Sequence, residues 1–348
     1  MKIMHLLQSP QFSGAENVVC QIIAMLKSEP DLEMVYCSQD GPIRRALEER
    51  NITFIPLKEF TISAVKAAII KEKPDIIHAH DMRASYYAAR ACGKTPLISH
   101  IHNNAFNSRG ISLKSIAYVY AGIKAKHIFW VSKSSYEGYA FHCLFKRKST
   151  ILYNIVDIDE IYTRRDIDKN KYDYDVIYIG RLTYQKNPQR LMNIFKLLVE
   201  KKKDVRIAVV GTGELEEEVK RLSSRLRISE NVDFLGYMNN PLKVLSDSKV
   251  IAMASRWEGT PMCVLEAQSL GIPVVSTPTD GLRDIIVDGK NGYLSDDDDA
   301  LAQRIYDILV DDDLRSRMKE NSVKRIKKIM DKKYYISKIK KAYGLTSN

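Results

Sequence analysis

Short apolar runs alternate with longer amphipathic stretches over most of the chain. The apolar runs are rich in β-branched residues, and the stretches between them repeat their apolar positions with a helical period. This alternation predicts successive strand and helix units, which build a parallel sheet. In the first half the predicted strands are residues 3–7, 33–37, 75–79, 96–101 and 127–131.

A charged stretch with few apolar residues, 157–175, interrupts the pattern and is typical of an interdomain linker. Further strands are predicted after it, at residues 176–179, 205–210, 232–235, 250–254 and 273–276. Because 348 residues are enough for two cores, the sequence predicts an α/β protein with two doubly wound, Rossmann-like domains, at 1–156 and 172–330. The Lys-rich tail from residue 313 to residue 343 is helical in period. Its last helix, at about 331–348, is expected to cross back onto the first domain.

No segment is predicted to cross a membrane or to direct secretion. No run approaches the roughly 20 apolar residues that span a bilayer, and polar Gln8 and Ser9 follow the first predicted strand directly. We therefore expect a cytoplasmic protein. The five cysteines lack C-x-x-C spacing, which argues against a zinc site or a disulfide framework, and we expect them to be buried thiols.

Positive charge is concentrated in the first half. The net charge is +11, and residues 1–150 contain 20 Lys and Arg against 12 Asp and Glu, whereas residues 151–348 contain 34 against 31. This asymmetry suggests that the first half meets an anionic partner, either a phosphorylated acceptor or a membrane surface. Nucleic acid is a competing explanation, but no helix-turn-helix, zinc-finger or RNP-type signature accompanies the charge, so we expect no nucleic-acid partner.

Two glutamates with seven residues between them, Glu258 and Glu266, bracket a predicted helix start. Thr260 suits the N-cap, and Pro261 suits the first helical position. The N–H groups of residues 262–264 would then point out of the helix start, and with the helix dipole they form a site for a diphosphate. Glu258 would reach a sugar on that diphosphate, and Glu266 the hydroxyls of a ribose. The alternative is a capped surface helix with two solvated glutamates.

Two cations follow the first predicted strand of the second half, in the segment Gly180-Arg181-Leu182-Thr183-Tyr184-Gln185-Lys186-Asn187. Open parallel sheets bind ligands at the carboxyl ends of their strands, which is where Arg181 and Lys186 are expected. The pair suits a departing nucleotide diphosphate. The alternative is two loop cations in solvent.

Glycines end another predicted strand of this half. Gly211 and Gly213 form only part of a dinucleotide fingerprint, because the third glycine and a suitably spaced acid are missing, and this disfavours a nicotinamide dehydrogenase. The loop is instead expected beside a nucleotide base, together with the loop at Gly236.

The first half carries a polar loop and a group of histidines. Ser13 and Glu16 have the spacing of a capping box, and Gly14 between them lets a phosphate or a sugar approach the backbone. Four histidines follow two strand ends, and alternation places two of them on one face. One imidazole there suits a sugar hydroxyl or a proton in transfer. Structural histidines and a two-histidine metal site are the alternatives. These residues are His78, His80, His100 and His102.

These motifs, in this order and over nearly the whole chain, resemble those of glycosyltransferase family 4. The resemblance implies the GT-B fold, with the active site in the cleft between two domains, and retaining, metal-independent transfer of a sugar from a nucleotide donor without a cofactor. It implies catalytic roles for His102, Arg181, Lys186 and Glu258. It implies a donor site at Gly14, Gly180, Gly211, Gly213, Gly236, Thr260, Pro261, Met262, Cys263, Val264, Leu265 and Glu266, and an acceptor side at Ser13, His80 and Asn103. The first loop departs from the family pattern, since Ser13 stands where many members have a second glycine.

We therefore expect a retaining hexosyl- or N-acetylhexosaminyltransferase. The donor would be a UDP-sugar, and the acceptor a saccharide or a polyprenyl-diphosphate-linked glycan in bacterial capsule or exopolysaccharide synthesis. Residues 106–126 mix cations with apolar and aromatic residues, which suits a face resting on the anionic inner membrane, although an ordinary core helix has the same pattern. A nucleotide-sugar epimerase of the same fold and a non-catalytic nucleotide-sugar-binding protein are the alternative functions.

Overall fold

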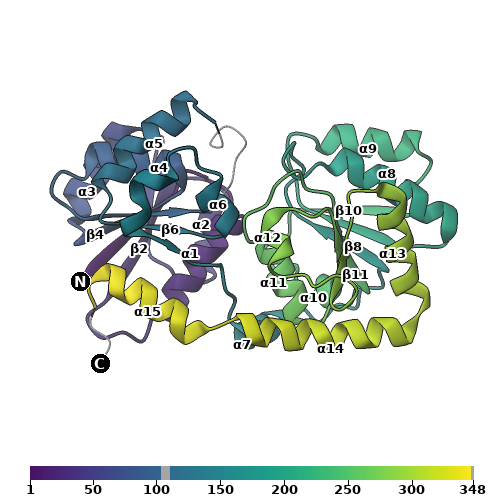
Figure 1. Ribbon diagram of the computed structural model, residues 1–348. Helices are drawn as coiled ribbons and strands as arrows, with labels where there is room; N and C mark the ends of the chain where they lie inside the picture. The colour runs from purple at the N-terminus through teal and green to yellow at the C-terminus, as the bar shows by residue number, and fades with distance from the viewer. Residues whose placement is uncertain (103–109, 346–348) are drawn as a thin grey trace. The chain divides into compact units, whose positions relative to one another are not determined.

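The computed structural model describes residues 1–102 and 110–345, which fall into two compact units (Figure 1). Met1–Ile155 and the C-terminal segment from Lys332 form the first unit, and Val156–Asp331 form the second. Each unit is a parallel sheet covered by helices, so the predicted α/β class with two Rossmann-like domains is confirmed.

The first unit contains a seven-stranded sheet in the order β3-β2-β1-β4-β5-β6-β7. Its strands are β1 Lys2–Leu6, β2 Glu33–Gln39, β3 Phe54–Leu57, β4 Ile76–His80, β5 Leu97–Ile101, β6 His127–Trp130 and β7 Ser149–Ile151. Both faces are buried: in β2, Val35 and Cys37 pack into one apolar cluster and Tyr36 into another. Burial on both faces explains why the strands read as continuous apolar runs.

Helices cover the two faces of this sheet. They are α1 Gly14–Met25, α2 Ile43–Glu48, α3 Ile62–Glu72, α4 Asp81–Ala91, α5 Leu113–Lys124, α6 Lys133–Glu137, the 3₁₀ helix η2 His142–Lys148 and α15 Lys332–Tyr343. Val19 of α1 and Ile43 of α2 belong to one cluster, whereas Val65 of α3 and Ala84 of α4 belong to the other. The two faces therefore have separate cores.

The second unit contains a six-stranded sheet in the order β10-β9-β8-β11-β12-β13. Its strands are β8 Val176–Ile179, β9 Ile207–Val210, β10 Val232–Gly236, β11 Val250–Met253, β12 Val274–Ser276 and β13 Gly292–Leu294. Its helices are α7 Ile158–Arg165, α8 Pro188–Lys201, α9 Glu216–Arg225, α10 Leu242–Ser246, α11 Met262–Ser269, α12 Asp280–Arg283, α13 Asp298–Val310 and α14 Asp312–Ile329. Buried residues of α8 and α13 pack with those of the central strands in one core.

The sequence pattern missed the strands β3, β7 and β13. All three lie at sheet edges and are only partly buried. An edge strand needs fewer apolar residues, and it tolerates a proline such as Pro56, which has no N–H to give to a neighbour. Their apolar signal is therefore weak.

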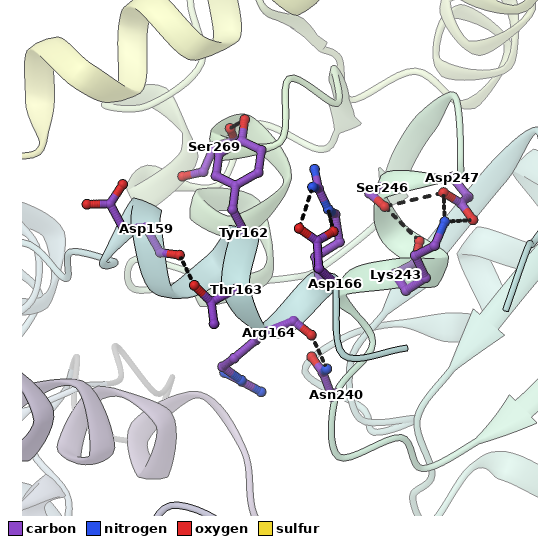
Figure 2. A network of polar contacts seen from close by, with 11 residues as sticks. Asp159, Tyr162, Thr163, Arg164, Asp166, Asn240, Lys243, Ser246, Asp247 and Ser269 are labelled. Carbon is purple, nitrogen blue, oxygen red and sulfur yellow. Dashed lines mark hydrogen bonds and ion pairs between the residues drawn. The ribbon is translucent and has the colours of Figure 1, made fainter. Parts of the chain in front are cut away.

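The stretch expected as a linker contains helix α7, which belongs to the second unit (Figure 2). Tyr162 Oη donates to the carbonyl oxygen of Ser269 at 3.2 Å, and Asn240 Nδ2 donates to that of Arg164 at 2.7 Å. Ile161 is buried. The buried Ile161 and these long-range hydrogen bonds hold a helix in which every second residue on average is charged, which is why periodicity did not reveal it.

Two further expectations bear on composition. Cys20, Cys37 and Cys92 are buried, but Cys143 is exposed and Cys263 is half-buried, so the expectation of five buried thiols was wrong for two of them. No helix in the described parts of the chain combines the length and the apolarity of a membrane span.

The tail forms two helices, α14 and α15, and α15 groups with the first unit. Tyr335, Ile339 and Tyr343 of α15 are buried. Tyr343 Oη lies 2.8 Å from His78 Nδ1 of β4, and Lys340 Nζ lies 2.6 Å from Glu29 Oε1. A buried aromatic ring with a buried polar contact thus ties the end of the chain to the first sheet.

We expect Tyr343→Ala to destabilise the first unit by about 3–5 kcal/mol, because it removes a buried ring and leaves a cavity. Tyr343→Phe keeps the ring but removes the partner of His78, and it should cost about 1–3 kcal/mol. Urea unfolding followed by amide exchange in residues 76–80 measures both. Equal unfolding midpoints for the two variants and the wild type would contradict this role of α15.

Candidate active site

The strand order of the second unit places two motif loops beside each other. Strands β9 and β10 lie on one side of β8, and β11, β12 and β13 lie on the other. The connections after β8 and β11 therefore run in opposite directions and leave a crevice at the carboxyl edge of the sheet, where open parallel sheets bind ligands. The loop after β8 carries Lys186, and the loop after β11 carries Glu258.

Lys186 and Glu258 form an ion pair between these two loops. Lys186 Nζ lies 2.6 Å from Glu258 Oε1, and the side chains are only 14% and 5% exposed. Loss of one partner of a buried pair leaves an uncompensated charge, which is strongly destabilising. The sequence analysis assigned Lys186 to the donor diphosphate and Glu258 to the donor sugar. The structure adds that the two side chains contact each other.

Arg181 lies on the same loop as Lys186, and its side chain is exposed. The backbone of the loop is held from below, because the buried Tyr178 of β8 donates its hydroxyl to the carbonyl oxygen of Arg181 at 2.9 Å. A Cβ at Gly180 would lie 2.8 Å from that hydroxyl oxygen. Gly180 therefore makes room for the tyrosine.

Helix α11 begins one residue later than the sequence predicted. Pro261 is the N-cap and Met262 the first helical residue, so placing the cap at Thr260 was wrong. The predicted free N–H of Val264 is also wrong, because it donates to the carbonyl oxygen of Pro261 at 3.1 Å, as does that of Leu265 at 3.3 Å. Met262 and Cys263 remain in the first turn, where an α-helix leaves its N–H groups unpaired within the helix.

The other members of this motif are enclosed by the unit. Thr260, Leu265 and Glu266 are buried, and burial raises the pKa of the Cys263 thiol to about 12. Cys263 is therefore a neutral thiol at pH 7 rather than a nucleophile. Glu266 lies within α11, about one turn beyond the first helical residue.

Gly211 and Gly213 have a packing role that the sequence did not reveal. A Cβ at Gly211 would lie 2.0 Å from the carbonyl oxygen of Gly180, and one at Gly213 would lie 2.3 Å from that of Leu182. These two glycines let the loop after β9 rest on the loop after β8. Gly236 has φ +66°, and a Cβ there would meet no atom within 4 Å. Its carbonyl oxygen accepts from Gly211 N at 2.7 Å.

Several buried polar atoms at this edge have no hydrogen-bond partner in the described structure. All lie at the end of β12 or in the loops after β8, β11 and β12, and sequence reasoning missed them as site residues. Buried polar atoms are nearly always paired, so such a group is typical of a place that receives a ligand or water. The atoms are Thr183 Oγ1, Ser255 Oγ, Trp257 Nε1, Ser276 Oγ and Thr279 Oγ1.

In the first unit the strand order reverses between β1 and β4. Ser13 and Gly14 follow β1, and His80 ends β4. Ser13 is the N-cap of α1, but its hydroxyl donates to the buried Glu16 carboxylate and does not cap the backbone, so the predicted capping box was wrong. A Cβ at Gly14 would have no atom within 4 Å, which leaves its backbone approachable.

The four predicted histidines come together, and His5 of β1 joins them. His5 Nδ1 lies 3.0 Å from His80 Nε2, and His80 Nδ1 lies 2.8 Å from His102 Nε2, so three imidazoles form a hydrogen-bonded chain. His100 stacks on His102 with ring centroids 4.3 Å apart. Sequence reasoning missed His5, because only the strand order places β1 beside β4.

Burial dominates the electrostatics of these histidines. It lowers the pKa of His5 to about 3, and it lowers the pKa of His78, His80, His100 and His102 below the ordinary value. The rings are therefore neutral at pH 7. Two sets could geometrically hold a metal ion, His5 with His78 and His80, and His80 with His100 and His102. Each set has three histidines, where the sequence suggested two. Asn103, predicted on the acceptor side, lies outside the described residues.

Two family models match the chain and together extend over most of it. Residues 12–160 match Glycosyltransferase Family 4, and residues 159–325 match Glycosyl transferases group 1. The chain belongs to glycosyltransferase family 4. This family 4 glycosyltransferase is therefore an enzyme, as the motifs predicted.

Named relatives are similar to this glycosyltransferase over most of its chain. An Escherichia coli UDP-Gal:alpha-D-GlcNAc-diphosphoundecaprenol alpha-1,3-galactosyltransferase is 26% identical over 95% of this chain and 96% of its own. A Campylobacter jejuni N-acetylgalactosamine-N,N'-diacetylbacillosaminyl-diphospho-undecaprenol 4-alpha-N-acetylgalactosaminyltransferase is 31% identical over 67% of this chain and 63% of its own.

Solved structures establish the fold of this glycosyltransferase. HepE of Anabaena, in complex with UDP and glucose, superposes with a TM-score of 0.85 at 20% identity, covering 99% of this chain and all of its own. Sucrose-phosphate synthase of Thermosynechococcus elongatus gives 0.77 at 14% identity, covering 99% and 98%. The predicted GT-B fold is confirmed.

Replacing Lys186 with Ala should lower kcat by two or more orders of magnitude. The change removes a positive charge at the crevice between the loops after β8 and β11, and it leaves Glu258 buried without its partner. Lys196→Ala is the matched control, since Lys196 lies on α8 in a more exposed pair with Glu200, at 3.2 Å. Initial rates of nucleotide release report the difference. A Lys186→Ala enzyme with the rate of the Lys196→Ala enzyme would refute the role of the pair.

The first unit should lose stability as the pH falls below about 6.5. The folded pKa values of the buried histidines lie below the unfolded value, so above this pH both states are neutral, and below it only the unfolded state gains protons. Each such histidine lowers the free energy of unfolding by about 1.4 kcal/mol per pH unit. His100→Phe should make the slope shallower by that amount, measured by urea unfolding between pH 5 and 7.5. Parallel slopes would contradict it.

Proposed function

We propose that this glycosyltransferase moves a hexosyl or N-acetylhexosaminyl group from a UDP-sugar to a polyprenyl-diphosphate-linked saccharide, with retention, in the synthesis of a bacterial surface glycan such as a capsule. The buried Lys186–Glu258 pair carries the proposal, because it lies in the crevice at the carboxyl edge of the sheet, close to the start of α11. The names of the Escherichia coli and Campylobacter jejuni relatives, both with a diphosphate-linked undecaprenol acceptor, support this choice of acceptor.

In this proposal the donor diphosphate lies at the start of α11 and against Lys186. Lys186 then shares its charge between Glu258 and the diphosphate, while Glu258 accepts hydrogen bonds from the donor sugar. Arg181, exposed on the same loop, supplies a second cation. Preorganised charges of this kind act mainly on the charge that develops in the transition state.

The proposed transfer breaks the bond between the anomeric carbon and a phosphate oxygen and forms one to the acceptor oxygen on the same face. The acceptor hydroxyl proton passes to the departing phosphate oxygen, and the sugar passes through an oxocarbenium-like state. Glu258 is assigned to sugar hydroxyls, so no protein nucleophile is needed. Because Lys186, Arg181 and the helix dipole of α11 offset the diphosphate charge, we propose that transfer requires no metal ion.

The unpartnered polar atoms at the strand ends support a sugar-binding role for this edge. A hexose presents hydroxyls that both donate and accept, and Ser255 Oγ and Thr279 Oγ1 can do the same. Trp257 Nε1 can only donate. Such a set matches a polyhydroxyl ligand better than it matches an apolar one.

An exposed apolar stripe on α5 supports a membrane-facing acceptor surface. Leu113, Ile116, Tyr120 and Ile123 follow one another at helical spacing, and Leu113 is 89% exposed. Lys114 and Lys124, also exposed, lie on the same helix. An apolar stripe beside cations is the composition that rests on anionic lipid. Tyr118, included in this face at the sequence level, is fully buried and belongs to the core.

The substrate proposal predicts sugar transfer only when donor and acceptor are both present. UDP-galactose, UDP-glucose, UDP-GlcNAc and UDP-GalNAc would each be incubated with a GlcNAc-diphosphate-polyprenol, with and without EDTA. We expect one donor to give a disaccharide with an α-linkage in both conditions, because the cations and not a metal stabilise the leaving group. Mass spectrometry and NMR identify the product.

Conversion of the donor sugar without an acceptor would indicate an epimerase and refute the proposal, as would tight UDP-sugar binding without turnover. A product of inverted configuration would refute retention alone. Lys186→Ala serves as the inactive control.

The membrane proposal predicts flotation with vesicles of anionic phospholipid at low salt and release at high salt, because charge attraction is screened as the salt concentration rises. Replacing both Ile116 and Ile123 with Ser should abolish flotation without lowering activity on a short, water-soluble acceptor. Ile70→Ser is the control, since Ile70 is also exposed but lies on α3. Absence of flotation by the wild type at low salt would dispose of this proposal.

A further inference from the structure

The loops that carry the two charged residues are tied together by hydrogen bonds. The lysine loop is residues 180–187, and the glutamate loop is residues 254–261. Arg256 N donates to the carbonyl oxygen of Gln185 at 2.9 Å, and Gln185 Nε2 donates to that of Trp257 at 3.1 Å. Each loop thus donates one hydrogen bond to the other.

Arg256 adds a second, side-chain link between the same loops. Its Nε donates to the carbonyl oxygen of Tyr184 at 3.2 Å, and its Nη2 donates to Asn187 Oδ1 at 3.0 Å. Its guanidinium carbon also lies 4.3 Å from the centroid of the Tyr184 ring. The planar fork of an arginine holds its donor nitrogens in a fixed arrangement, so it can reach two separate acceptors in one geometry, whereas a lysine donates from a single nitrogen.

The acceptors of Arg256 stand on either side of Lys186 in the sequence. Tyr184 precedes it by two residues and Asn187 follows it, while Arg256 itself is two residues before Glu258. The Arg256 side chain, two residues before Glu258, therefore contacts the lysine loop both before and after Lys186.

Asn187 shows that the lysine loop has a specific, constrained shape. It is buried, has φ +53° in the left-handed region, and occupies the N-cap of α8 without capping it through its side chain. Asparagine is among the few residues other than glycine that tolerate this conformation. Its side-chain oxygen accepts from Arg256 Nη2, so one of the contacts that hold the lysine loop comes from the glutamate loop.

We propose that Arg256 is a positioning residue, which joins the lysine and glutamate loops and holds Lys186 and Glu258 in the geometry that receives the donor diphosphate. This rests on the proposed function of the same site. Arg256 acts through the pair and does not need to touch the donor. A displacement of about 1 Å at a reacting group can cost on the order of 10²-fold in rate, which sets the size of the effect.

Arg256→Ala should lower kcat/KM for the donor by about 10- to 100-fold. Arg256→Lys keeps the positive charge but not the fork, and it should behave like Arg256→Ala. Arg206→Ala is the matched control. Arg206 also lies over a tyrosine ring, at 5.3 Å from the centroid of Tyr174, and it pairs with Asp173. It directly precedes β9 and so lies at the amino edge of the sheet, opposite the crevice. The control should keep the rate of the wild type.

A double-mutant cycle separates positioning from a direct contact with the donor. UDP affinity is measured by calorimetry for Lys186→Ala, Arg256→Ala and the double variant. If Arg256 acts through Lys186, the double variant binds about as weakly as Lys186→Ala alone, since interacting residues are not additive. Additive losses, or a wild-type rate for Arg256→Lys, would overturn the proposal.

Amide exchange in residues 182–187 tests the link without any nucleotide. Arg256→Ala and Asn187→Gly, which keeps the left-handed backbone but removes the acceptor, should both speed exchange there, whereas Arg206→Ala should not. Unchanged exchange in both would overturn the joining of the loops. Failure of the wild type to bind UDP would refute the proposed function instead, and the exchange experiment would still decide the role of Arg256 in the loops.

Discussion

In a parallel sheet all strands end at one edge, and the loops diverge only where the strand order changes direction. This constraint places the chemistry of both units. In the second unit the change lies between β8 and β11, and in the first it lies between β1 and β4. Each motif that carries charged or polar side chains follows one of these four strands or their immediate neighbours. The fold thus gathers residues that are more than 70 positions apart, as Lys186 and Glu258 are.

A buried ion pair at such a point needs loops that do not move. Two charges taken out of water are tolerated only when the geometry of the pair is good and its neighbours are satisfied. The supports come from several directions: Tyr178 holds the lysine loop from the strand below, Gly211 and Gly213 bring the next loop against it, and Arg256 joins it to the glutamate loop. A Cβ at Gly281 would fall 1.2 Å from the carbonyl oxygen of Gly259, so helix α12, which follows β12, also packs closely against the glutamate loop.

The first unit gathers neutral groups where the second gathers charged ones. Strand register sets His5 beside His78 and His80 beside His100, and helix α15 adds the hydroxyl of Tyr343. Burial keeps these imidazoles uncharged, and His5 and His80 share a hydrogen bond. The unit therefore gathers buried, neutral imidazoles along its central strands.

The sequence alone determined the repeated strand–helix pattern, the two Rossmann-like halves, the GT-B fold and the glycosyltransferase family, because apolar periodicity and short loop motifs are local properties. It placed β8 at its observed residues. Only the tertiary structure decided which distant side chains meet. The pairing of Lys186 with Glu258, the link through Arg256, the addition of His5 to the other histidines and the close loop packing at Gly211 all depend on strand order and register, which no local pattern encodes. Helix α7 has the same cause, since hydrogen bonds to distant residues hold it to the second unit.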